Sequence, residues 1–107
     1  EYKELGHEKC SKMILDRLGD NPIYVTFDLD CLDPTVAPGV ANIESAFRGF
    51  NMDEARKLLQ SLKGRNVIGG DVACLMPTKD SPNNITSMVA AAVMFEIICL
   101  ISINLKK

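Results

Sequence analysis

The sequence of 107 residues is poor in several residue types on which common functions depend. It has one histidine, no tryptophan and 6% aromatic residues, and its formal net charge is -2. A single histidine gives no basis for a histidine-rich metal site or for a Ser/His/Asp triad. Nucleic-acid-binding proteins present a strongly basic surface or stacking aromatic side chains, and this composition supplies neither. We therefore expect no nucleic-acid partner.

The cysteines lack the CxxC pairs that are typical of zinc ribbons and thioredoxin-like proteins. The four of them are far apart in the chain, at Cys10, Cys31, Cys74 and Cys99. Cysteines at this low density are typical of reduced thiols in an intracellular protein. We expect a cytoplasmic or mitochondrial location, and a targeting segment upstream would be missing from this chain, which begins with glutamate rather than methionine.

Long uninterrupted hydrophobic runs are also missing. The most apolar segment, residues 88–103, is interrupted by Glu96 and is shorter than the roughly 18 uninterrupted apolar residues expected of a membrane span. A buried C-terminal helix is therefore favoured over a membrane anchor, and we expect no membrane partner. Ser81 and Pro82 would supply the N-cap and the first-turn proline of this helix.

The remaining pattern alternates between helical and strand segments and predicts an α/β fold. The predicted elements are helices over residues 6–18, 52–62 and near the C-terminus, strands over residues 23–29 and 66–73, and a long loop over residues 30–48. Strands that alternate with helices are parallel and are joined by right-handed crossovers. Two strands with helices on both faces need neighbours at their open edges. We therefore expect one part of a larger α/β sheet.

Two aspartates lie at the end of the first predicted strand. Asp28 and Asp30 are two residues apart, so their carboxylates share one side of the strand. They lie at the carboxyl end, where open α/β sheets bind ligands. Carboxylates this close repel each other unless a proton or a cation lies between them, and one or two divalent metals would meet this need. Such pairs also occur in turns, caps and solvated loops, so the spacing alone leaves these alternatives open.

The surrounding residues make the pattern more specific. The segment from Phe27 to Pro34, followed by Ala37-Pro38-Gly39, resembles the second signature of the ureohydrolase family, which includes arginase, agmatinase, guanidinobutyrase and formimidoylglutamase. The strand that contains Asp71 resembles the Gly-x-Asp strand of the family, and Met94-Phe95-Glu96 is most like agmatinases. The resemblance extends over about residues 20–101.

The resemblance implies a fold and an activity. Residues 1–107 would be the C-terminal part of a ureohydrolase domain, with about two strands and three helices of a three-layer α/β/α arginase-like parallel sheet. Ureohydrolases use two Mn²⁺ ions to activate a water that attacks a guanidinium carbon and releases urea. The substrate would be a small guanidino compound such as agmatine. The full-length protein would form homo-oligomers, as trimers or hexamers.

The resemblance also implies roles for individual residues. Asp28 matches the carboxylate that bridges both metals, and Asp30 matches a ligand of one of them. Asp71 would support the site from the neighbouring strand. Asn42, Glu44 and Cys74 are candidates for the substrate side of the site.

Two departures from the family pattern weigh against an active chain. The family has further metal ligands in upstream histidine-containing blocks that this chain lacks, so the chain alone is expected to be inactive. Cys74 stands where the family has a glutamate that pairs with the substrate guanidinium, and a neutral thiol cannot supply that pairing. The alternative is therefore a non-catalytic truncated paralogue that binds or regulates full-length subunits. A stand-alone binding module is a third interpretation, and the incomplete sheet argues against it.

Overall fold

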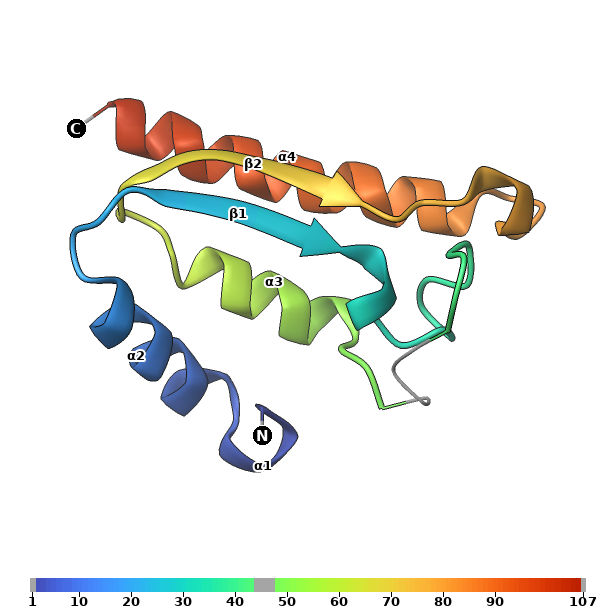
Figure 1. Ribbon diagram of the computed structural model, residues 1–107, viewed down its shortest axis with the longest axis horizontal. Coiled ribbons are helices and arrows are strands. Elements are labelled where there is room, and N and C mark those ends of the chain that lie inside the picture. Colours follow the sequence, from blue (N-terminus) through green and yellow to red (C-terminus); the bar gives the residue numbers. More distant parts are fainter. Residues whose placement is uncertain (1, 44–47, 107) are drawn as a thin grey trace.

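The computed structural model describes residues 2–43 and 48–106 and has the predicted alternation of helices and strands (Figure 1). The elements in chain order are α1 (Tyr2–Leu5), α2 (His7–Leu18), β1 (Ile23–Asp28), the 3-10 turn η1 (Leu29–Cys31), α3 (Met52–Gln60), β2 (Val67–Ala73), the 3-10 turn η2 (Pro77–Lys79) and α4 (Ile85–Leu105). The sequence pattern had not predicted α1, η1 or η2, which are too short to show a periodicity.

The two strands pair in parallel, as expected for strands that a helix connects. Thr26 lies opposite Asp71 and Asp28 lies opposite Ala73, so the two strands reach the same edge of the sheet together. The chain leaves this edge from β1 into η1 and from β2 into the segment that begins at Cys74. The register therefore brings two segments that are far apart in the sequence to one place.

The core lies on one face of this sheet. Phe27 of β1 packs in one buried cluster with Leu59 of α3 and Ile97 of α4. A second buried cluster contains Ile23 of β1, Val67 of β2, Leu100 of α4 and Leu62, which follows α3. Side chains of α2 pack against this cluster. Tyr24 and Thr26 alternate with the buried residues of β1 and are exposed on the opposite face. Among the described residues, this chain supplies two strands and one helical layer, which confirms the prediction of one part of a larger α/β sheet.

The start of α3 follows the sequence prediction. Asn51 accepts a hydrogen bond through its side chain from the amide of Glu54, at 2.8 Å. The Glu54 carboxylate accepts one in return from the amide of Asn51, at 3.0 Å. This capping box satisfies two amides that the first helical turn leaves without partners, and it fixes where the crossover helix begins.

The start of α4 differs from the prediction. The helix begins at Ile85, beyond Ser81 and Pro82, and its first amides are satisfied by the carboxylate of Asp80. The hydroxyl of Ser81 accepts a longer hydrogen bond of 3.2 Å from the amide of Ile85. Asp80 takes the capping role because its carboxylate can accept two amides at once, whereas a serine hydroxyl accepts one here.

The apolar character of α4 exceeds what its packing requires. The helix has 21 residues and contains an 18-residue window with a mean hydropathy of 2.3, which makes it long and apolar enough to cross a membrane by length and composition. Core helices of soluble proteins pass the same test. Val93, Ile97 and Leu100 are buried against the sheet and α3, while the side chain of Phe95 is 66% exposed. Glu96, which interrupts the apolar run, binds Arg56 and Gln60 of α3.

The segment that follows η1 is held close to the ends of both strands. Leu32 forms a bridge with Phe50, and Val40 forms one with Leu75, just beyond β2. Gly49 lies so close to this segment that a Cβ atom there would come within 2.6 Å of the backbone at Leu32 and Asp33. The described residues of the loop, 32–43 and 48–50, are therefore packed beside the sheet edge.

Candidate metal centre

Three side chains with metal-binding atoms converge at the carboxyl ends of β1 and β2. One carboxylate oxygen each of Asp28 and Asp30 and the Sγ atom of Cys74 all lie within 4.8 Å of one another. Asp28 is the last residue of β1, Asp30 lies in η1, and Cys74 follows β2. Asp28 and Cys74 are exposed, and Asp30 is half-buried. The group is therefore open to solvent on the edge where ligands bind in α/β sheets.

Local backbone geometry holds these side chains in place. The carboxylate of Asp28 accepts a 3.1 Å hydrogen bond from the amide of Asp30, which begins the turn η1. Cys74 has a φ of 71°, in the left-handed region that a non-glycine residue seldom adopts. The paired strand before Cys74 and the bridge from Leu75 to Val40 after it hold this conformation.

The electrostatics of the group favour an ionised Asp28. Desolvation would raise the pKa of Asp28, but the hydrogen bonds with Asp30 and Cys74 outweigh it and lower this pKa. A carboxylate that stays ionised is what a bound cation requires. The neighbouring thiol behaves differently, because burial and the charges of Asp28 and Asp30 raise the pKa of Cys31 to about 11. Cys31 is therefore a protonated thiol at neutral pH.

The donor set fits a divalent cation. Two carboxylates supply the hard oxygen ligands that Mn²⁺ prefers, and a thiol can supply a softer sulfur ligand. Three protein donors are fewer than two metals need, so a two-metal centre needs ligands from outside this group.

Asp71 lies on the neighbouring strand and faces β1. Its carboxylate accepts hydrogen bonds from the hydroxyl of Thr26 at 2.7 Å and from the hydroxyl of Tyr24 at 2.9 Å. Thr26 and Asp28 share a face of β1, so Asp71 stiffens the strand face that presents Asp28. The direct partners of Asp71 are thus hydroxyl groups of β1, and its supporting role at the metal site stays a prediction.

The structure places the other candidates differently. Cys74 lies against the two aspartates, and its substrate-side role stays a prediction. Asn42 is exposed in the loop between η1 and α3. Glu44 lies outside the described residues. The substrate-side roles of Asn42 and Glu44 therefore stay predictions.

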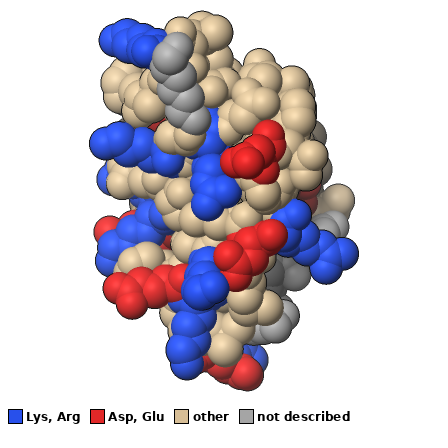
Figure 2. Space-filling view, turned by 90° about the vertical axis from the view of Figure 1, so that its left-hand side faces the viewer, with Lys and Arg blue, Asp and Glu red and all other residues tan. Residues whose placement is uncertain are grey.

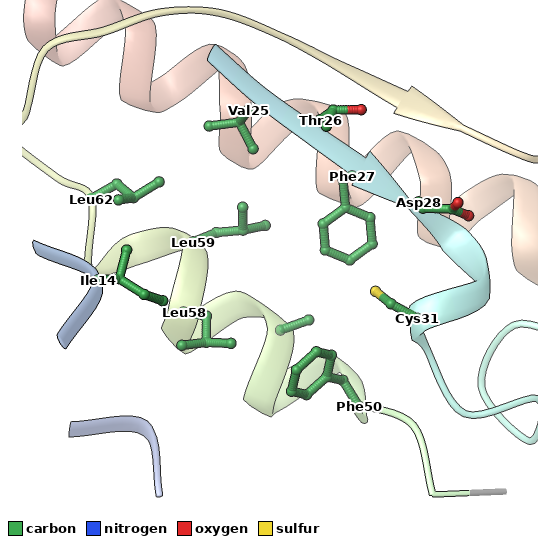
Figure 3. Close-up of a pocket in the computed structure, with 11 residues that line it drawn as sticks. Ile14, Val25, Thr26, Phe27, Asp28, Cys31, Phe50, Leu58, Leu59 and Leu62 are labelled. Carbon is green, nitrogen blue, oxygen red and sulfur yellow. The ribbon is translucent and has the colours of Figure 1, made fainter. Parts of the chain in front are cut away.

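An apolar pocket of about 360 Å³ lies beside the centre, between β1 and α3. Figure 3 shows Phe27 pointing from β1 toward α3, with the sulfur of Cys31 at the same end of the pocket. Asp28 lies at the rim, and most of the lining is aliphatic or aromatic. The pocket therefore adds apolar volume next to the carboxylates without adding a further charged group.

Charged side chains elsewhere are of both signs. On the face shown in Figure 2, Lys and Arg residues are interspersed with Asp and Glu residues. Several of them form exposed ion pairs, such as Lys12 with Asp16 and Lys57 with Asp53. Such pairs contribute little to stability and do not form a surface of a single sign.

Sequence reasoning missed the closeness of Cys74 to the aspartates. It assigned Cys74 to the substrate side, because the family resemblance places it where a glutamate pairs with the substrate guanidinium. The register of the two strands was the signal that could have revealed it, since Asp28 pairs with Ala73, the residue before Cys74.

Comparison with known proteins shows which family the chain resembles. The model of the arginase family matches residues 1–100. The agmatinases of Enterobacter sp. (strain 638) and Salmonella newport (strain SL254) are each 41% identical over 98 residues, which are 92% of this chain and 31% of the relative. The chain thus spans about a third of the length of the curated relatives that it matches.

Solved structures agree with this match. A hypothetical agmatinase from Burkholderia thailandensis is 36% identical, with a TM-score of 0.84 over 92% of this chain and 30% of that one. Proclavaminate amidino hydrolase from Streptomyces clavuligerus is 29% identical, with a TM-score of 0.90 over 97% of this chain and 34% of that one. The parallel strands and the single helical layer are therefore a part of the larger fold of these proteins.

Proposed function

Because the chain belongs to the arginase family, we propose that it is the C-terminal part of an agmatinase-like ureohydrolase. The reaction is the Mn²⁺-dependent hydrolysis of a small guanidino compound, agmatine or a related one, to urea and an amine. The observation that carries this proposal is the convergence of Asp28 and Asp30 at the edge where the two strands end.

Each aspartate has a defined part in this proposal. Asp28 would hold both metals, as the family resemblance implies, and its lowered pKa keeps the carboxylate in the ionised form that a cation needs. Asp30 binds one metal from the turn that follows β1. When bound, the metal supplies a water made acidic enough to act as a nucleophile at neutral pH. Asp71 orders the strand face that carries Asp28 through its bonds to Thr26 and Tyr24.

The remaining metal ligands belong to a part of the enzyme that lies outside this chain. The chain spans 31% of its agmatinase relatives, and the group at the sheet edge supplies too few donors for two metals. We therefore propose that the chain alone is inactive and that the complete protein is an intracellular homo-oligomer.

The presence of Cys74 favours a second candidate function. A thiol stands where the family resemblance places a glutamate that pairs with the guanidinium, and a thiol provides no such charge. A chain of this kind can act as a non-catalytic partner that binds full-length subunits. This alternative predicts association with an agmatinase and no gain of urea production.

Calorimetric titration of the chain with Mn²⁺ tests the proposed metal site. We expect binding that is lost when Asp28→Asn and Asp30→Asn are combined. Asp53→Asn is the matched control, because it removes an exposed aspartate on α3. Equal Mn²⁺ binding by the double variant and the unmodified chain would contradict the proposal.

A complementation assay separates the two functions. The chain is mixed with an agmatinase from Enterobacter that lacks its C-terminal third, and urea release from agmatine is measured. Urea production that depends on Asp28 supports the enzyme. Association without urea production supports the non-catalytic partner.

A further inference from the structure

We infer that Cys74 is a third protein ligand at the Asp28–Asp30 centre, so that the centre accepts a thiophilic divalent metal such as Zn²⁺ or Co²⁺ as well as Mn²⁺. The inference rests on the proposed function, because it assigns the metal at the same centre. It goes further by giving Cys74 a role in metal binding rather than on the substrate side.

The distances support direct ligation. Donor atoms that share one metal at roughly 2.0–2.3 Å from it lie within about 4.6 Å of each other. The Sγ atom of Cys74 and the two carboxylate oxygens already lie within 4.8 Å of one another. Small rotations of the side chains are enough to close this difference. The three donors come from two strand ends, so they surround a point instead of lying along one segment.

The position of Cys74 is fixed by its backbone. Residues up to Ala73 pair with β1, and Leu75 pairs with Val40. The left-handed φ of Cys74 lies between these two anchors. The side chain is exposed, so a metal can reach it from solvent. Cys31, by contrast, lines the apolar pocket between β1 and α3 (Figure 3).

The chemistry of the donors sets the preference. A thiolate binds softer metals more strongly than it binds Mn²⁺, whereas carboxylates alone do not discriminate in this way. As the metal–sulfur bond forms, the thiol proton leaves to solvent, and no group is oxidised or reduced. Replacing the sulfur with a hydroxyl removes this preference and leaves the two carboxylates in place.

The test is a titration of the chain with Co²⁺ and with Cd²⁺, followed by ultraviolet and visible absorption. Direct ligation by sulfur gives a thiolate-to-metal charge-transfer band that rises with bound metal. We expect the band to vanish in Cys74→Ser and to persist in Cys31→Ser and Cys99→Ser. In competition experiments, the preference for Zn²⁺ over Mn²⁺ should fall about tenfold or more in Cys74→Ser.

The outcomes separate this inference from the proposed function. Metal binding that depends on Asp28 and Asp30 but gives no charge-transfer band overturns the role of Cys74 and leaves the aspartate site intact. A charge-transfer band that is lost in Cys31→Ser and persists in Cys74→Ser would show that Cys31 is the sulfur ligand, and this also overturns the inference. A chain that binds none of these metals, with its helical circular dichroism intact, contradicts both the inference and the proposed metal site.

Discussion

The backbone amide of Gly39 donates a 2.9 Å hydrogen bond to the hydroxyl of Thr86, which is fully buried. The bond joins the loop that follows the two aspartates to the first turn of α4. A Cβ atom at Gly39 would lie only 3.0 Å from Asp80 and Thr86, so the loop and the helix are packed closely here. This buried hydrogen bond thus anchors the loop at Gly39 to the start of α4.

Replacing Thr86 with valine should destabilise the chain. The substitution keeps the shape of the side chain but leaves the amide of Gly39 buried without an acceptor, which costs about 1–3 kcal/mol. Urea-induced unfolding measures the free energy. Thr35→Val is the control, because this exposed hydroxyl bonds to Asp33 at the surface and its loss should change stability by less than about 0.5 kcal/mol. Equal losses in the two variants would show that the Gly39 contact is unimportant.

Acid should destabilise the start of α4 through Asp80. Desolvation would raise the pKa of Asp80, but hydrogen bonds from Thr86 and Ser87 outweigh it and hold this pKa well below its usual range. The pKa is lower in the folded chain than in the unfolded one. The stabilisation is therefore complete above the unfolded value of about 3.9 and is lost as the pH falls toward the folded value.

Thermal unfolding followed by circular dichroism between about pH 2 and pH 6 tests this dependence. In Asp80→Asn, we expect a lower melting temperature at pH 6 and a smaller decrease on acidification. Part of the decrease should remain, because hydrogen bonds also lower the pKa of Asp33 and Glu54. Asp20→Asn, at an exposed turn, should follow the unmodified chain. If the melting temperature of Asp80→Asn depended on pH as that of the unmodified chain does, Asp80 would not be the cause of the acid sensitivity.

The elements that local patterns determine were predicted correctly. β1 combines β-branched and aromatic residues, β2 contains β-branched residues, and the box of Asn51 and Glu54 marks the start of α3. The spacing of Asp28 and Asp30 predicted that both carboxylates lie together at one sheet edge, and they do. The reason differs from strand alternation, because β1 ends at Asp28 and Asp30 lies in the turn η1.

Features that depend on contacts between distant segments could not be predicted from the sequence. The capping of α4 by Asp80 requires the chain to fold back over several residues through Asn84, which has a left-handed conformation. Cys74 meets the aspartates through the register of the strands. The sheet face with Tyr24 and Thr26 is exposed in this chain. The chain covers only 34% of a solved structure with the same fold, so the sequence of this part alone could not show what packs on that face.

A pair of adjacent isoleucines tests how α4 is packed. Ile97 is 1% exposed and contacts the sheet at Gly70, where a Cβ atom would come within 2.6 Å of it. Ile98 is 54% exposed on the other side of the helix. Ile97→Ala should lower the free energy of unfolding by about 2–5 kcal/mol, because it leaves a cavity in the core. Ile98→Ala should cost less than about 1 kcal/mol, since the exposed side chain loses few contacts.

Comparing Ile97→Ala with Ile98→Ala shows which face of α4 packs on the sheet. Chemical denaturation in the absence of lipid gives both values under the same conditions. If α4 belongs to the core layer of an α/β fold, the effect of Ile97→Ala far exceeds that of Ile98→Ala. Similar effects at both positions would show that α4 does not pack on the sheet through this face. The apolar character of the helix would then need another cause, such as insertion into a membrane.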